Sequence, residues 1–194
     1  MRPAQAGDVC ILLEPSADEL SYLRAYQRRL QAVFGGQLVE HVHVTCQRYR
    51  PDASEHLTRI VYKMVDELAS VEPFPLLPAS VVTLQSEFWE TSLARWTVQE
   101  TDAWRSLIAV LNRTLQELSC PPHYQGDWPP TCGALEHIAP GQPLLGLDEA
   151  LPQVLFEART AVLSQVEGQG RFTLLKKVTL GSGKASSSAG GQYR

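Results

Sequence analysis

The stretch from Glu40 to Tyr49 constrains this chain more than any other, because its polar and apolar residues alternate with a period of two. As a β-strand it places His41, His43 and Thr45 on one face and apolar residues on the other. Burying an imidazole or a hydroxyl without a hydrogen-bond partner costs about 1–3 kcal/mol. The polar row therefore predicts a cleft rather than a core, and the rest of the sequence must supply the facing wall.

Hydrophobic periodicity predicts three amphipathic helices. The first spans about residues 17–33, begins with an S-x-x-E capping box at residues 16–19, and ends at Gly35-Gly36, since glycine tolerates the left-handed C-cap. The second begins at Ser54 and the third at Thr101-Asp102. These helices lie between segments that read as strands, so the chain mixes both kinds of element.

Short apolar or alternating runs predict the strands, at residues 8–14, 38–48, 80–85, 92–98, 131–138, 156–167 and 171–180. Residues 73–80 are rich in proline and read as an extended connection, and residues 139–153 as a loop with one helical turn near residues 148–151. Because hairpins mix with helices, an α+β fold with antiparallel sheets is favoured over a doubly wound parallel sheet. We expect one domain over residues 1–180 and a disordered Gly/Ser-rich tail over residues 181–194.

Composition limits the function. The net charge of −4 and the pI of about 5.7 provide no global basic field for unspecific binding to duplex nucleic acid. The chain has no apolar run of 18 residues, which excludes a membrane span, and no glycine-rich phosphate loop after a strand. The four cysteines are scattered without a CxxC pair, which predicts buried free thiols in a reducing cytosol rather than zinc ligands; they are Cys10, Cys46, Cys120 and Cys132.

His43-Val44-Thr45 lies on a predicted strand that follows a helix ending in Gly-Gly. After it come a helix, a hairpin, another helix and a second strand behind a proline-rich loop. In this motif and layout the chain resembles the two-histidine (2H) phosphoesterases. This superfamily includes the 2′-5′ RNA ligase-like proteins and the RNA 2′,3′-cyclic phosphodiesterases. The resemblance covers about residues 8–180. It implies a bilobal fold with two antiparallel sheets and outer helices around a central cleft, where two His-x-Thr/Ser motifs face each other without a metal or other cofactor.

The resemblance implies that His43 is an acid/base residue and that the Thr45 hydroxyl holds phosphate. Paired histidines suit acid–base chemistry because they titrate near neutral pH. By layout the second motif falls at Pro130-Thr131-Cys132-Gly133, where Thr131 stands in place of the histidine and Gly133 in place of the hydroxyl residue. Near neutral pH threonine cannot act as a proton donor or acceptor in the way an imidazole does, and glycine offers only its backbone. Three other histidines remain as substitutes: His137 if the alignment slips, His123 in the preceding loop, and His41.

Several residues are candidates for binding a substrate. Aromatic side chains stack on bases and arginine or lysine meets phosphate, which singles out His41, Arg48, Tyr49, Arg95, Trp96, Tyr124, Trp128 and Lys176. For Trp96, packing in the core is the favoured interpretation.

The resemblance predicts a cytoplasmic protein, favoured as a monomer, that acts on RNA or nucleotide 2′,3′-cyclic or 2′-5′ phosphodiesters with reduced activity. A homologue that binds RNA, a nucleotide or a protein partner without turnover is the alternative. A third possibility is an α+β interaction protein in which the histidine row is incidental.

Overall fold

The computed structural model describes residues 4–52, 54–86, 91–120, 129–139, 151–168 and 171–183. Its helices are α1 (Ala17–Phe34), α2 (Ser54–Ala69) and α3 (Asp102–Glu117). Its strands are β1 (Val9–Glu14), β2 (Gln37–Leu38), β3 (Val44–Tyr49), β4 (Phe74–Leu76), β5 (Pro78–Ser86), β6 (Thr91–Val98), β7 (Thr131–Ile138), β8 (Phe156–Ala158), β9 (Thr160–Gly168) and β10 (Arg171–Thr179).

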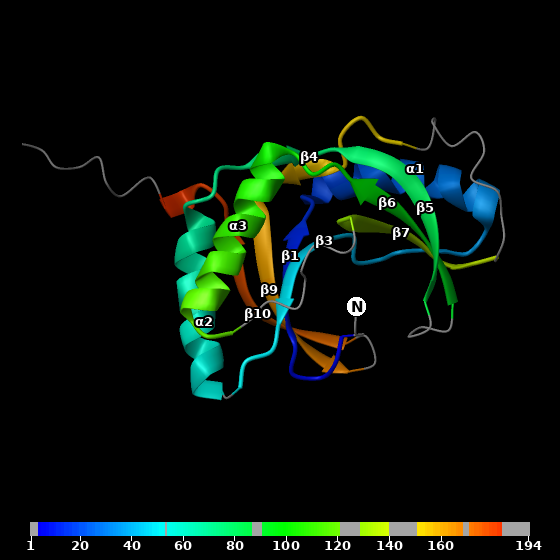
Figure 1. Ribbon diagram of the computed structural model, residues 1–194. Coiled ribbons are helices and arrows are strands. Elements are labelled where there is room, and N and C mark those ends of the chain that lie inside the picture. Colours follow the sequence, from blue (N-terminus) through cyan, green and yellow to red (C-terminus); the bar gives the residue numbers. More distant parts are fainter. Residues whose placement is uncertain are drawn as a thin grey trace, which may run out of the picture.

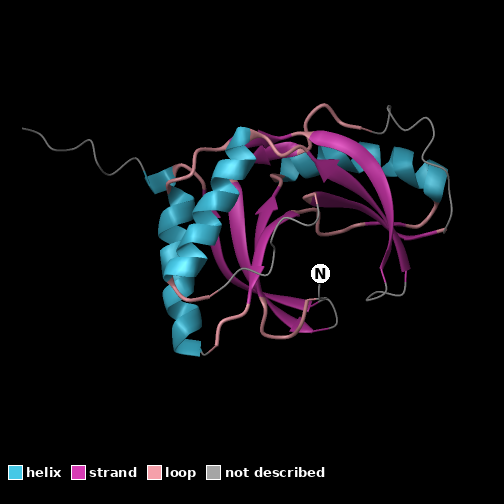
Figure 2. Ribbon diagram, viewed as in Figure 1, coloured by secondary structure: helices cyan, strands magenta, loops and turns pink. Residues whose placement is uncertain are grey.

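An eight-stranded antiparallel sheet organises the molecule, in the order β10-β9-β1-β3-β7-β6-β5, with β2 on the edge of β7 (Figures 1 and 2). One residue pair, Val44 with Cys132, joins β3 to β7. The sheet therefore consists of two halves that meet at this pair. The remaining strands, β4 and β8, form a separate two-stranded sheet. The predicted α+β class with mainly antiparallel pairing is confirmed.

The helices begin and end where the local sequence predicts. Ser16 and Glu19 form the complete capping box of α1, and Gly35 closes the helix with φ +68°, a conformation that favours glycine. The hydroxyl of Thr101 accepts a hydrogen bond from the Trp104 N–H and caps α3. These local signals explain why the helix bounds agree with the prediction within one or two residues.

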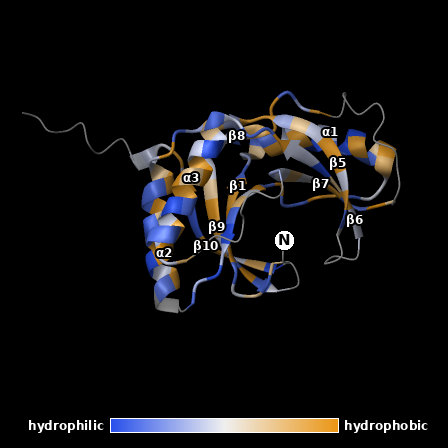
Figure 3. Ribbon diagram, in the orientation of Figure 1, coloured by the Kyte–Doolittle hydropathy of each residue, from blue (hydrophilic) through white to orange (hydrophobic). Residues whose placement is uncertain are grey.

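The helices cover the two halves separately. Helices α2 and α3 lie side by side against the half formed by β10, β9, β1 and β3, and α1 lies against β7 and β2 (Figure 1). Hydrophobic and hydrophilic residues alternate along all three helices, as expected for amphipathic helices on a sheet (Figure 3). Their buried residues join the strands in one continuous core. A second cluster of Cys10, Leu12, Val162 and Val166 lies on the opposite face of β1 and β9.

The structure corrects the strand predicted over residues 38–48, which is divided into β2 and β3. The N–H of Val39 donates to the carbonyl of Ala134, whereas Val44 pairs with Cys132. Between these two connections, residues 40–43 on one side correspond to the single residue Gly133 of β7 on the other. Four residues cannot match one in a regular ladder, so they leave the sheet as a loop.

Two further segments differ from the prediction. The proline-rich connection contains β4, in which Pro75 is tolerated because the small sheet has only two strands. The described start of the predicted tail, residues 181–183, forms a turn against α2, where the position of a Cβ on Gly183 would lie 3.1 Å from the Ala69 carbonyl oxygen. The rest of the tail and the turn expected near residues 148–151 lie outside the described residues, apart from Leu151. No helix in the described ranges is long and apolar enough to span a membrane.

Candidate functional site

His43 lies at the end of the loop, directly before β3. Its Nδ1 is 2.8 Å from the carbonyl oxygen of His41, which can only accept a hydrogen bond. Nδ1 therefore carries the proton, and in the neutral ring Nε2 is a free proton acceptor. The first motif thus presents the form of imidazole that a general base requires.

The surroundings keep His43 neutral. Burial lowers the pKa of His43 below its ordinary value of 6.5, and the nearby positive charges of Arg95 and His41 lower it further. The hydrogen bond to the His41 carbonyl favours the protonated ring and opposes this shift. Because the lowering effects dominate, His43 is mainly unprotonated at pH 7.

Strand register brings the two motif positions together. Val44 pairs with Cys132, the one pair between β3 and β7, so the chain neighbours of the two residues, His43 and Thr45 on one side and Thr131 and Gly133 on the other, lie close to this junction. Alternation turns these four residues to the face opposite the fully buried Val44 and Cys132. This junction therefore brings Thr131 near the first motif.

A cation takes part in the same group. Arg95 on β6 pairs with Gly133, and its Nη1 donates a hydrogen bond of 3.3 Å to Thr131 Oγ1. The guanidinium also contributes to the lowered pKa of His43, which means that its charge acts at the imidazole. His43, Thr45, Thr131 and Arg95 are all half-buried. Together they can bind an anion between a neutral base, two hydroxyls and a fixed positive charge.

Val39, the residue before the loop of residues 40–43, occupies the space that a side chain at position 133 would need. A Cβ built on Gly133 would lie 3.2 Å from Val39 Cγ1, tighter than ordinary van der Waals contact. Val39 is held there by α1, because Arg24 Nη1 and Gln27 Nε2 both donate to its carbonyl, at 2.6 and 3.2 Å. Gln27 also donates to the carbonyl of Ala134 at 2.9 Å, and it is fully buried.

None of the described alternative histidines replaces the missing imidazole. His137 is exposed at the far end of β7, with φ +55°, and its Nδ1 is 3.0 Å from Thr91 Oγ1. It lies five residue positions beyond Cys132 along the strand, or roughly 17 Å. His41 is exposed on the loop and contributes its carbonyl to His43 rather than sharing a strand face with it. His123 lies outside the described residues.

A β-bulge changes the faces expected for two binding candidates. The register of β3 against β1 shifts between Thr45 and Gln47, which reverses the alternation beyond Thr45. Tyr49 consequently faces the core and is completely buried, and Arg48 is 5% exposed with its Nε 3.8 Å from Asp8 Oδ2. Both side chains are inaccessible to a ligand in this conformation.

The other candidates are divided. Trp96 is fully buried in the core, as favoured from the sequence, and Lys176 is exposed on β10. Tyr124 and Trp128 lie outside the described residues. The sequence reasoning missed Val39, Arg24 and Gln27. The one available signal was Gln27, an amide in line with the apolar positions Leu23 and Leu30 of the first helix.

The cysteines are free and buried, as predicted. Burial raises the pKa of Cys10 to about 11 and that of Cys132 to about 12, so neither thiol is reactive at neutral pH. Within the described ranges, no three side chains of the metal-binding types gather into a possible metal site.

Known proteins resemble this chain in structure but not in sequence. No family model matches the sequence, and no curated protein is similar to it. The structure is similar to that of E. coli LigT complexed with 3′-AMP, with 11% identity, a TM-score of 0.62 and coverage of 91% of this chain and 99% of that one. TT0787 of Thermus thermophilus is 17% identical, with a TM-score of 0.63 and coverage of 90% of this chain and 98% of that one. Usb1 of Kluyveromyces marxianus is 10% identical, with a TM-score of 0.57 and coverage of 92% of this chain and 100% of that one. The chain has the LigT-like fold, which confirms the fold expected from the resemblance to 2H phosphoesterases.

Proposed function

We propose that this chain binds a phosphodiester of RNA or of a nucleotide at His43, Thr45, Thr131 and Arg95, and hydrolyses it slowly. The proposal is supported mainly by the junction of Val44 with Cys132, which brings the Nδ1-protonated His43 near Thr131 and the Arg95 that donates to it. The solved structures of LigT with 3′-AMP, ATP and NADP+ support a nucleotide ligand for this fold. The four free thiols favour a cytosolic location.

The chemistry follows from which protons can move. With a 2′,3′-cyclic phosphate, His43 Nε2 takes a proton from the attacking water as the new P–O bond forms. Arg95 stabilises negative charge on the phosphoryl oxygens but keeps its protons at this pH. The bond to the leaving ribose oxygen breaks, and that oxygen must take its proton from solvent. Loss of a positioned general acid typically costs about 10²–10⁴-fold in rate, so slow turnover is expected.

The test is hydrolysis of a nucleoside 2′,3′-cyclic phosphate by the wild type and by His43→Ala. We expect the variant to be about 10²–10⁴-fold slower. His137→Ala is the matched control, because His137 is exposed and at the other end of β7. Equal rates for wild type and His43→Ala, or no hydrolysis by either, would rule out the enzyme.

A binder without turnover is the second candidate, and the packing of Val39 against Gly133 favours it. It requires that calorimetry detect binding of the cyclic nucleotide to the wild type, weakened in Arg95→Gln, while no product forms. The incidental histidine row has less support, since His41 is exposed and His43 is half-buried rather than sealed under apolar side chains.

A further inference from the structure

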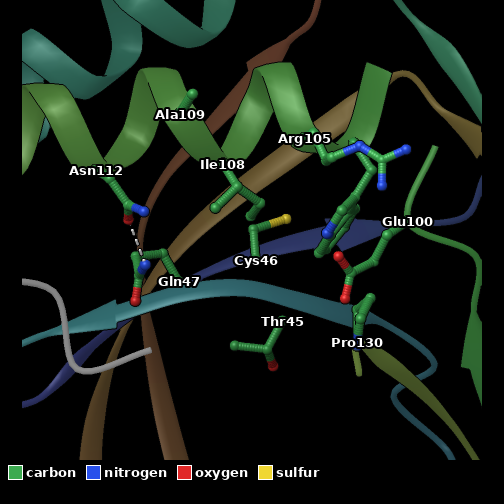
Figure 4. Close-up of a pocket in the computed structure, with 10 residues that line it drawn as sticks. Thr45, Cys46, Gln47, Glu100, Arg105, Ile108, Ala109, Asn112 and Pro130 are labelled. Atoms are coloured by element: carbon green, nitrogen blue, oxygen red, sulfur yellow. Dashed lines mark hydrogen bonds between the residues drawn. The ribbon is translucent and has the colours of Figure 1, made fainter. Parts of the chain in front are cut away.

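A cavity opens where the two halves of the sheet separate. Beyond the pair of Val44 with Cys132, the edge of β3 makes no further ladder with β7. The space between this edge and α3 is a cavity of about 270 Å³ (Figure 4), bordered by Thr45 on β3 and by Pro130, the residue before Thr131. It therefore lies directly behind the candidate site.

The long walls of the cavity are apolar. The Cys46 side chain points toward α3 and the Ile108 side chain points toward β3 (Figure 4). Trp104 completes this lining, and its indole is 5% exposed. A narrow space between a strand and a helix, with an aromatic ring at its side, suits a flat ligand.

One end of the cavity offers a directed hydrogen-bond donor. Gln47 Nε2 donates to Asn112 Oδ1 at 2.7 Å, and Gln47 Oε1 accepts from the Arg48 N–H at 2.9 Å. This arrangement fixes the Asn112 amide and turns its nitrogen toward the cavity (Figure 4). Among the described residues no hydrogen bond from that nitrogen is recorded. It can donate to a ring nitrogen or a carbonyl oxygen.

The other end carries Glu100 and Arg105, one charge of each sign. The cavity therefore has no net charge to hold a phosphate, in contrast to the group around Arg95. Its volume lies just under the range of about 300–1,000 Å³ typical of pockets for drug-sized ligands, which limits the occupant to about one ring system. Asparagine amides read the edges of nucleobases, and bases stack on aromatic side chains.

We propose that this cavity binds a nucleobase. The base belongs either to the nucleotide whose phosphate lies at Thr45 and Thr131, a link that rests on the proposed function, or to a separate nucleoside that binds beside β3. In both cases Asn112 donates to the base and Trp104 provides the ring contact.

The test uses adenosine, which has no phosphate, followed through the indole N–H resonance of Trp104 in ¹⁵N-labelled protein, with Trp104→Phe to assign the peak. We expect a saturable shift in the wild type. Ala109→Phe, at the exposed rim of the cavity, should weaken binding at least tenfold. Ala103→Phe is the matched control on the exposed side of the same helix and should leave binding unchanged. Asn112→Ala should weaken binding about tenfold.

Competition separates the two sources of the base. If one nucleotide spans both places, 2′,3′-cyclic AMP displaces adenosine, and both Ala109→Phe and Thr45→Val weaken its binding. If the sites are separate, adenosine still binds with 2′,3′-cyclic AMP present. Adenosine binding that depends on Ala109 supports the nucleobase site even when no hydrolysis is found. No shift in the wild type, or equal binding by both phenylalanine variants, would show that the cavity is only a packing gap.

Discussion

Building a second His-x-Ser motif into β7 is the most direct test of the proposed proton chemistry. Thr131→His places an imidazole next to Cys132, the residue that joins β7 to the first motif. Gly133→Ser returns a hydroxyl, but its Cβ would lie 3.2 Å from Val39 Cγ1. Overpacking of this kind costs about 1–3 kcal/mol. Val39→Ala removes the obstructing methyl groups, so the three substitutions belong together.

The expected gain in rate follows from the restored proton donor. A positioned general acid is typically worth about 10²–10⁴-fold. Arg95 donates to Thr131 Oγ1 at 3.3 Å, so its positive charge would lie beside the new imidazole. This charge would lower the pKa of the new ring, just as it helps to lower the pKa of His43. A smaller fraction of the new acid would then be protonated at pH 7.5. We expect the triple variant to gain most below pH 6.5.

The assay is hydrolysis of a nucleoside 2′,3′-cyclic phosphate between pH 5 and 8, with thermal unfolding to show that each variant is folded. Val39→Ala alone is the control for loop packing, and the triple variant with His43→Ala is the control for the first motif. Two results would contradict the proposed acid–base pair: a folded triple variant no faster than wild type at any pH, or a gain that survives the loss of His43.

Three further predictions concern stability. Gln27→Leu removes three hydrogen bonds from a fully buried amide, two donated to the Val39 and Ala134 carbonyls and one accepted from Arg24, so urea unfolding should show a loss of about 1–3 kcal/mol. Gln31→Leu removes one hydrogen bond, from a half-buried amide to the Gly36 carbonyl, and should lose less. The lowered pKa of folded His43 means that the unfolded chain binds its proton more tightly. Stability should therefore fall as the pH drops from 7 through the ordinary value of 6.5 toward the lowered one, and His43→Gln should flatten this dependence; parallel curves would contradict it. Ser16→Ala removes the N-cap of α1 and should cost about 0.5–2 kcal/mol in thermal unfolding, with exposed Ser106→Ala nearly neutral.

Local signals were sufficient to predict the elements whose ends are determined by nearby residues. The capping box of α1 and the N-cap of α3 involve side chains three residues from their partners, so the sequence alone contains both members. The bounds predicted for β7, residues 131–138, agree with the structure for the same reason, since a proline-rich segment precedes it and a proline follows.

The division of the predicted strand over residues 38–48 was not visible in its own sequence. Alternation continues through residues 40–43, but these residues leave the sheet because β7 offers only Gly133 opposite them. That mismatch depends on a partner about ninety residues later in the chain. The bulge after Thr45 is similar, because it becomes apparent only when β3 is paired with β1. Periodicity within a single strand therefore predicted the partly accessible positions of His43 and Thr45 but misplaced His41 and Tyr49.

Thr131 and Gly133 belong to one packed arrangement that also includes the loop before β3 and helix α1. Thr131 leaves room for the Arg95 guanidinium, which donates to its hydroxyl, and Gly133 leaves room for Val39. Val39 in turn is held by Arg24 and Gln27, so the first motif's loop and the second motif's strand are tied to the same helix. At Thr131 and Gly133, where the resemblance to 2H phosphoesterases implies a second motif, an arginine that donates to Thr131 and an apolar contact with Val39 take up the space. Such a site favours holding an anion over relaying protons, which is why binding should persist in variants that abolish turnover.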